Sequence, residues 1–193
     1  MFLLMISFIV ALALVLVAMP KVIPYLHKLK FGQVEREEGL ASHKKKGGTP
    51  TMGGVVFIIA TVIAAYICHY QNFKNPYVNL LTFALVGFGL IGFIDDYLIV
   101  VQHSNKDAMQ SVIAIAFYFL AKAYLPNFST EIIIPIAHVS VNLGWFYPVF
   151  VYFMFTAESN AVNLTDGLDG LATGLMIIAL TPFVAFAILS KNV

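Results

Sequence analysis

The chain has 193 residues, of which 60% are hydrophobic and only 11% are charged. A soluble domain typically has about 45–50% apolar and about 25% charged residues, so this composition excludes an ordinary soluble protein. The net charge of +1 gives no general basic surface for a nucleic acid, and the single cysteine, Cys68, excludes an internal disulfide. The composition predicts an integral membrane protein.

Six apolar segments approach the length that a membrane-spanning helix needs, which is about 20 residues. The predicted spans are residues 2–19, 52–70, 79–100, 108–125, 143–157 and 171–190. The first of these carries no charge and follows no basic segment, so we expect an uncleaved span rather than a signal peptide. The expected fold is therefore all-α, with residues 1–193 forming one multi-span membrane domain.

Residues 21–50 form the one long polar stretch between predicted spans, and they hold seven of the eleven basic residues. The positive-inside rule predicts that this stretch is cytoplasmic and that the N-terminus lies outside. Its glycines, prolines and mixed charges favour an ordered loop rather than a helix. Alternation of the spans then places Asp95-Asp96 and residues 160–170 on the same cytoplasmic side, which favours one shared site.

Residues 71–78 and 126–142 are expected on the opposite face. The second segment contains Glu131 followed by a β-branched run that Pro135 interrupts. This pattern predicts a short extracellular hairpin.

Asp95 and Asp96 end the third predicted span. Neighbouring residues on a helix point about 100° apart, so one carboxylate can face a metal ion while the other faces a substrate. Two adjacent anions raise each other's pKa unless a cation offsets them, and a magnesium ion beside a diphosphate supplies that cation. A helix end that simply meets water is the alternative.

Residues 160–170 place two asparagines, two aspartates and two glycines between apolar segments. If this stretch is helical, Asp166 and Asp169 share a face, and Gly167 and Gly170 allow close approach of the backbone. Asp166 as an ordinary N-cap of the sixth helix is the alternative.

Residues 42–54 combine lysines, threonines and glycines. Such a segment can bind an anion through ammonium groups, hydroxyls and backbone amides. For Lys44 and Lys45 a basic loop near the membrane explains the charge equally well.

The run from Gly87 to Gly92 matches the pattern G-x-G-x-x-G. No strand or βαβ unit is predicted around it, so we reject a dinucleotide site. Glycines within a predicted span instead favour close helix packing.

Several of these segments, taken in order along the chain, resemble phospho-N-acetylmuramoyl-pentapeptide transferases, a family of polyprenyl-phosphate sugar-1-phosphate transferases. The resemblance lies in residues 31–33, 36–39, 42–43, 48–54, 92–97 and 160–170. It implies transfer of phospho-N-acetylmuramoyl-pentapeptide from its UDP-linked form to undecaprenyl phosphate, with Mg²⁺ as cofactor. The products are lipid I and UMP, so the implied process is peptidoglycan and cell-wall biosynthesis.

The resemblance also implies roles for single residues. Asp95 and Asp96 match the catalytic acidic pair, and Asn163 matches a magnesium ligand. Further positions match parts of the family that bind the nucleotide, namely Lys46, Thr51, Asp166, Gly167, Leu168 and Asp169.

The chain departs from the family pattern in its extent. The family fold has about ten spans of about 20 residues each, and its later acidic magnesium ligand and histidine-rich loop are missing here. We therefore keep two alternatives to the transferase: a truncated and inactive remnant or fragment, and a related UDP-N-acetylglucosamine/polyprenyl-phosphate phosphotransferase. The expected location is the bacterial plasma membrane, with the bilayer and both substrates as partners and a homodimer as one option.

Overall fold

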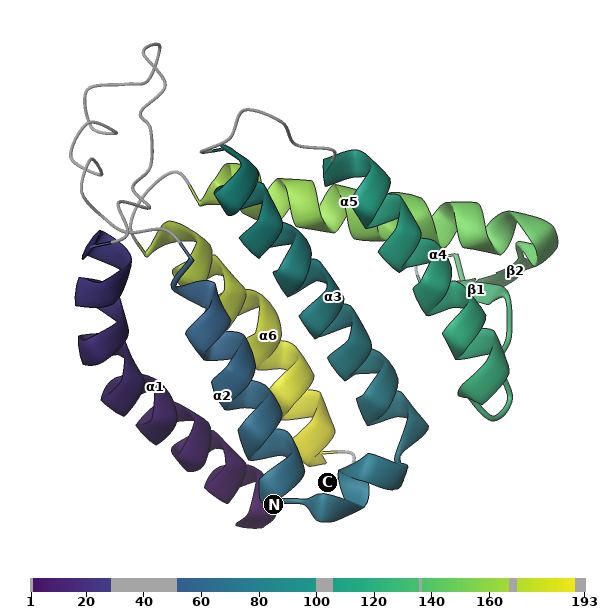
Figure 1. The fold of residues 1–193 in the computed structure, drawn as a ribbon. Helices are drawn as coiled ribbons and strands as arrows, with labels where there is room; N and C mark the ends of the chain where they lie inside the picture. Colours follow the sequence, from purple (N-terminus) through teal and green to yellow (C-terminus); the bar gives the residue numbers. More distant parts are fainter. Residues whose placement is uncertain (1, 29–51, 100–105, 136, 167–169, 190–193) are drawn as a thin grey trace.

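The structure is a computed structural model that describes residues 2–28, 52–99, 106–135, 137–166 and 170–189. Within these ranges the chain is mostly α-helical and carries one small sheet (Figure 1). The elements are α1 (Phe2–Lys28), α2 (Gly54–Ile67), η2 (Tyr70–Lys74), α3 (Pro76–Ile99), α4 (Lys106–Tyr124), β1 (Glu131–Ile134), β2 (Val139–Asn142), η3 (Gly144–Phe146), α5 (Tyr147–Thr165) and α6 (Leu171–Leu189).

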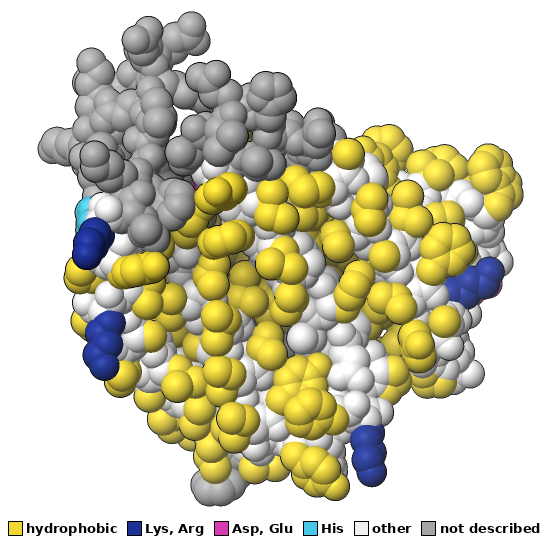
Figure 2. Space-filling model, in the orientation of Figure 1, with side chains coloured by type: hydrophobic (Ala, Val, Ile, Leu, Met, Phe, Trp, Pro, Cys, Tyr) yellow, Lys and Arg dark blue, Asp and Glu magenta, His cyan; other side chains and the backbone are white. Residues whose placement is uncertain are grey.

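Two of the described helices are long and apolar enough to cross a membrane, over Met5–Lys28 in α1 and Pro76–Tyr97 in α3. Shorter apolar helices cover Gly54–Ile67, Ala108–Tyr124 and Leu171–Phe186. Figure 2 shows one face of the molecule covered largely by hydrophobic side chains, with a few lysines toward its edges. The helical prediction is confirmed, whereas the number of spans stays a prediction.

The first helix is longer than the sequence pattern indicated. A loop was expected from Lys21 onward, but α1 continues to Lys28, so that expectation was wrong for residues 21–28. Pro20 and Pro24 lie inside the helix, where each removes a hydrogen-bond donor. His27 and Lys28 occupy the last turn, where positive charge interacts favourably with the helix dipole.

The corner between α2 and α3 is held by side-chain hydrogen bonds. Asn75 precedes the first residue of α3, and its Oδ1 accepts from the backbone N–H of Tyr77 at 3.0 Å. This is an N-cap followed by proline at the first helical position. The Tyr66 hydroxyl of α2 lies 2.9 Å from Asn79 Oδ1 and 3.0 Å from Thr82 Oγ1, which ties α2 to α3.

Small residues bring the helices close together. Ala60, Ala64 and Ala114 are buried. A Cβ added at Gly87 would lie 3.1 Å from Ile113 of α4, and one added at Gly89 would collide with Ile58 of α2. The glycines at 87 and 89 therefore serve helix packing, as predicted.

The predicted hairpin is present. β1 pairs with β2 in antiparallel register from Glu131 opposite Asn142 to Ile134 opposite Val139. Asn142 Oδ1 also accepts from the backbone N–H of Gly144 at 2.9 Å, and Gly144 adopts a positive φ of 49° at the start of η3. Figure 1 shows the hairpin at the end of the bundle region where α5 begins; its membrane side stays a prediction.

Candidate functional site

The C-terminal ends of α1, α3 and α5 lie toward the upper side of Figure 1, together with the N-terminal ends of α2, α4 and α6. Asp95 and Asp96 occupy the last two turns of α3, and both are half-buried. Because they are adjacent on a helix, their side chains diverge by about 100°. One helix end thus presents two carboxylates in different directions.

The polar run 160–170 is mostly the end of a helix rather than a loop. α5 begins at Tyr147 and continues to Thr165, so it overlaps the predicted span 143–157 but starts four residues later and ends eight residues later. Asn160 is half-buried and Asn163 is exposed on the last turns of α5. Thr165 Oγ1 donates to the carbonyl of Ala161 at 2.8 Å, which satisfies its hydroxyl within the helix.

Asp166 is the C-cap of α5, and its backbone N–H donates to the carbonyl of Val162 at 3.1 Å. The alternative of Asp166 as N-cap of the sixth helix is therefore wrong, since α6 begins only at Leu171. The prediction that Asp166 and Asp169 share one face of a helix also fails at Asp166, because α5 ends at Thr165. Gly170 has a φ of 82°, a conformation that suits glycine, immediately before α6.

At the start of α2, Met52 is buried and has a positive φ of 71°. Such a conformation is uncommon for a side chain other than glycine and marks a backbone held in place by its surroundings. The carbonyls of Met52 and Gly53 accept from the backbone N–H groups of Val55 and Val56, at 3.3 and 3.1 Å. Met19 of α1 packs beside Gly53, 3.6 Å from where a Cβ would be.

Several predicted site residues lie outside the described residues: Lys46, Thr51, Gly167, Leu168 and Asp169. In the described part of the chain, no three His, Cys, Asp or Glu side chains are close enough together to hold a metal ion. The structure thus places Asp95, Asp96, Asn163 and Asp166 at helix ends, and their joint role stays a prediction.

One polar contact at this site was not expected from the sequence. Gln110 of α4 is fully buried, and its Nε2 donates to Ser159 Oγ of α5 at 3.1 Å. A signal was present in the sequence: a polar amide in an otherwise apolar predicted span requires a partner within the protein. The sequence does not reveal which helix supplies that partner.

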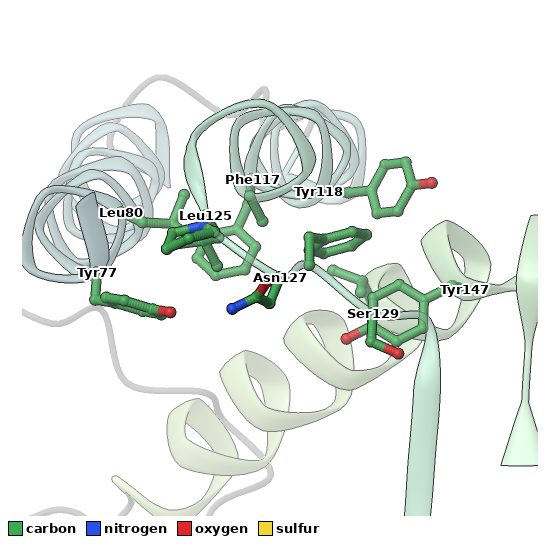
Figure 3. Close-up of a pocket in the computed structure, with 12 residues that line it drawn as sticks. Tyr77, Leu80, Phe117, Tyr118, Leu125, Asn127, Ser129 and Tyr147 are labelled. Atoms are coloured by element: carbon green, nitrogen blue, oxygen red, sulfur yellow. The ribbon is translucent and has the colours of Figure 1, made fainter.

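One cavity in the aromatic part of the molecule is unsuited to phosphates. It measures about 260 Å³ and lies between α3, α4, α5 and the segment that precedes β1. Figure 3 shows Tyr77, Phe117 and Tyr147 around Asn127. No charged side chain lines it, and it contains none of the predicted site residues. We therefore assign it no part in binding a diphosphate.

Comparison with known protein families gives two matches, a family and a signature sequence. Glycosyl transferase family 4 matches residues 77–193, which is more than half of the chain. A phospho-N-acetylmuramoyl-pentapeptide-transferase signature matches residues 46–58, which include Lys46 and Thr51.

Three similar proteins are each named phospho-N-acetylmuramoyl-pentapeptide-transferase. The one from Staphylococcus carnosus (strain TM300) is 49% identical over 191 residues, covering 94% of this chain and 58% of that protein. The one from Staphylococcus aureus (strain bovine RF122 / ET3-1) is 49% identical, covering 90% and 56%. The one from Staphylococcus haemolyticus (strain JCSC1435) is 47% identical, covering 91% and 57%. The chain thus spans less than three fifths of the length of these relatives.

Proposed function

Because this chain belongs to glycosyl transferase family 4, we propose that it takes part in transferring phospho-N-acetylmuramoyl-pentapeptide from UDP to undecaprenyl phosphate. The observation that carries this proposal is the signature at residues 46–58 in a chain 49% identical to a protein named for that activity. The products are lipid I and UMP.

The proposed setting is a bacterial plasma membrane. Residues 1–193 form one membrane domain with six spans, an external N-terminus and cytoplasmic site loops. The exposed apolar side chains of α1 and α6, among them Phe8, Ile178 and Phe183, suit contact with lipid. The acceptor is a lipid with a phosphate head group and reaches such a site from within the bilayer, whereas the nucleotide donor arrives from water. A site at the helix ends is accessible to both substrates.

In the proposed reaction, an oxygen of undecaprenyl phosphate attacks the phosphorus atom that bears the sugar. The bond from that phosphorus to the UMP oxygen breaks, and UMP leaves with the bonding electrons. Asp95 or Asp96 accepts the proton of a singly protonated acceptor phosphate, which makes the phosphate a better nucleophile. Both carboxylates are half-buried at the end of α3, and in this proposal that end lies at the membrane surface, where the acceptor phosphate would be.

The donor atoms fit a magnesium ion. Carboxylate and amide oxygens are the hard ligands that Mg²⁺ prefers, and it usually keeps several waters while binding one or two carboxylates and the substrate phosphates. A dense cluster of three acidic side chains is therefore not required. Asn163 and one aspartate of the α3 pair would hold the ion, which when bound neutralises negative charge on the two phosphates.

The remaining predicted residues would hold the nucleotide. We assign Asp166, Gly167, Leu168 and Asp169 to the uridine end of the donor. Lys46 and Thr51 would contact its phosphates, with the ammonium group offsetting charge as the bond to UMP breaks.

The test is Mg²⁺-dependent release of UMP by this chain in lipid nanodiscs. We expect UMP from UDP-N-acetylmuramoyl-pentapeptide only when undecaprenyl phosphate and Mg²⁺ are both present. Release from UDP-N-acetylglucosamine instead would support the related phosphotransferase. Binding of the donor without release of UMP would contradict catalysis by these 193 residues alone.

A further inference from the structure

The contact between α4 and α5 includes a polar side chain, Gln110, that is completely buried. Gln110 is 0% exposed and is the largest fully buried side chain among the described residues. Its Nε2 donates to Ser159 Oγ at 3.1 Å. Burying a polar side chain costs free energy unless it forms hydrogen bonds, so the Gln110 amide depends on a partner within the protein.

Two further polar atoms lie at the same helix pair. Gln110 Oε1 and Thr156 Oγ1 are buried and have no hydrogen-bond partner in the part of the chain that the structure describes. Exchanging the two ends of the amide would only move the unpaired atom from oxygen to nitrogen. We call the hydrogen-bonded pair Gln110 and Ser159, together with Thr156 one turn earlier on α5, the α4–α5 polar cluster.

The cluster lies on the helical face that leads to Asn163. Ser159 follows Thr156 by three residues and precedes Asn163 by four, and residues three or four apart lie on one face of an α-helix. Asn163 stands about 6 Å further along the axis than Ser159, at 1.5 Å per residue. A hydrogen bond at Ser159 therefore limits rotation of the helix turn that carries Asn163.

We propose that Gln110 is a positioning residue that acts through Ser159 to fix the rotation of the end of α5 and so the direction of the Asn163 amide. This inference rests on the proposed function for the role of Asn163 in binding the metal ion. Gln110 itself is one helix away and touches neither the ion nor a substrate. Packing at Gln110 by shape alone is the competing explanation, and Gln110→Leu preserves most of the volume while removing the hydrogen bond.

The positioning role is tested first without any ligand. Spin labels replace the exposed residues Val112 on α4 and Leu164 on α5, in a Cys68→Ser background. We expect Gln110→Leu to broaden or shift the distance distribution between the labels. Ser159→Ala, which removes only one hydroxyl, should produce the same change. A distribution that neither variant alters would overturn the inference, whatever the metal result.

The link to Asn163 is tested by Mn²⁺ binding, followed by electron paramagnetic resonance in nanodiscs. We expect Gln110→Leu and Ser159→Ala each to raise the Kd for Mn²⁺ about 10-fold, as loss of a residue that orients a metal ligand does. The double variant should lose little more than either single variant, because both remove one hydrogen bond. Losses that multiply would contradict a shared bond.

Val151→Ala is the matched control. Val151 is a buried residue of α5 that lines the aromatic cavity at the other end of the helix, so its truncation loosens packing without touching the polar cluster. Its Mn²⁺ affinity should stay within twofold of the parent. An equal loss in Val151→Ala and Gln110→Leu would show a packing effect and overturn the inference. If the parent binds no Mn²⁺, the proposed function is contradicted, while the label distances still decide the positioning role.

Discussion

Gly87 of α3 faces Ile113 of α4, and its replacement measures how closely these two helices pack. A Cβ at Gly87 would lie 3.1 Å from both Ile113 Cδ1 and Ile113 Cγ2. Carbon atoms attract best at about 3.5–4.0 Å, so the neighbour would have to yield. Gly92, on the same helix, has nothing within 4 Å of the corresponding position and provides the control.

The substitutions at Gly87 and Gly92 should change the melting temperature in opposite directions. Alanine is favoured over glycine within a helix by about 1 kcal/mol, so Gly92→Ala should raise the melting temperature by roughly 1–4 °C. Gly87→Val adds two methyl groups beyond a Cβ that would already lie 3.1 Å from Ile113. Overpacking typically costs about 1–3 kcal/mol, so this variant should melt roughly 2–12 °C lower.

The assay is thermal unfolding in one detergent, followed by circular dichroism. Ile113→Ala introduced together with Gly87→Val should restore part of the lost stability, because it removes the atoms that the valine meets. A Gly87→Val protein as stable as the parent would refute close packing of α3 against α4. So would a double variant whose losses simply add.

Three further predictions concern single residues. Tyr66→Phe removes the hydroxyl that bonds to α3 and should lower the free energy of unfolding by about 0.5–1.5 kcal/mol in the same melting assay. The Tyr70 side chain is 66% exposed, so Tyr70→Phe should leave the melting temperature unchanged. Asn75→Ala removes the N-cap of α3 and should cost about 1 kcal/mol, and an unchanged melting temperature would contradict the capping role. Asp95→Asn and Asp96→Asn should each lower UMP release about 100-fold or more while leaving the melting temperature within a few degrees; full activity in either variant would remove that residue from the mechanism.

Sequence alone predicted the helical class, the hairpin and the packing role of Gly87. Each of these depends on local information: apolar runs, β-branched residues near a proline, and glycines within a span. The C-terminal end of α1 was misplaced because charge was taken as the sign of a loop. Lys21 and Lys28 can extend along a helix and keep their ammonium groups in water, so charge does not by itself end a helix.

The end of α5 shows a second limit. Polar residues from Glu158 onward suggested that the helix had finished, yet backbone hydrogen bonds carry it to Thr165. Helix propensity depends weakly on side-chain polarity, and tertiary packing decides where the last turn lies. The Gln110–Ser159 hydrogen bond joins residues 49 apart in sequence, and no local pattern predicts such a pairing.

The position of a bound metal ion along the bundle tests most directly whether the ends of α3 and α5 form the site. Mn²⁺ replaces Mg²⁺, and a nitroxide is attached either at Tyr97, near the end of α3, or at Trp145, just before α5. A metal ion bound at the ends of α3 and α5 should strongly relax the label at Tyr97 and only weakly relax the label at Trp145, since the 19 residues of α5 alone extend about 28 Å. A stronger effect at Trp145, or equal effects at both, would contradict a metal site formed by the ends of α3 and α5.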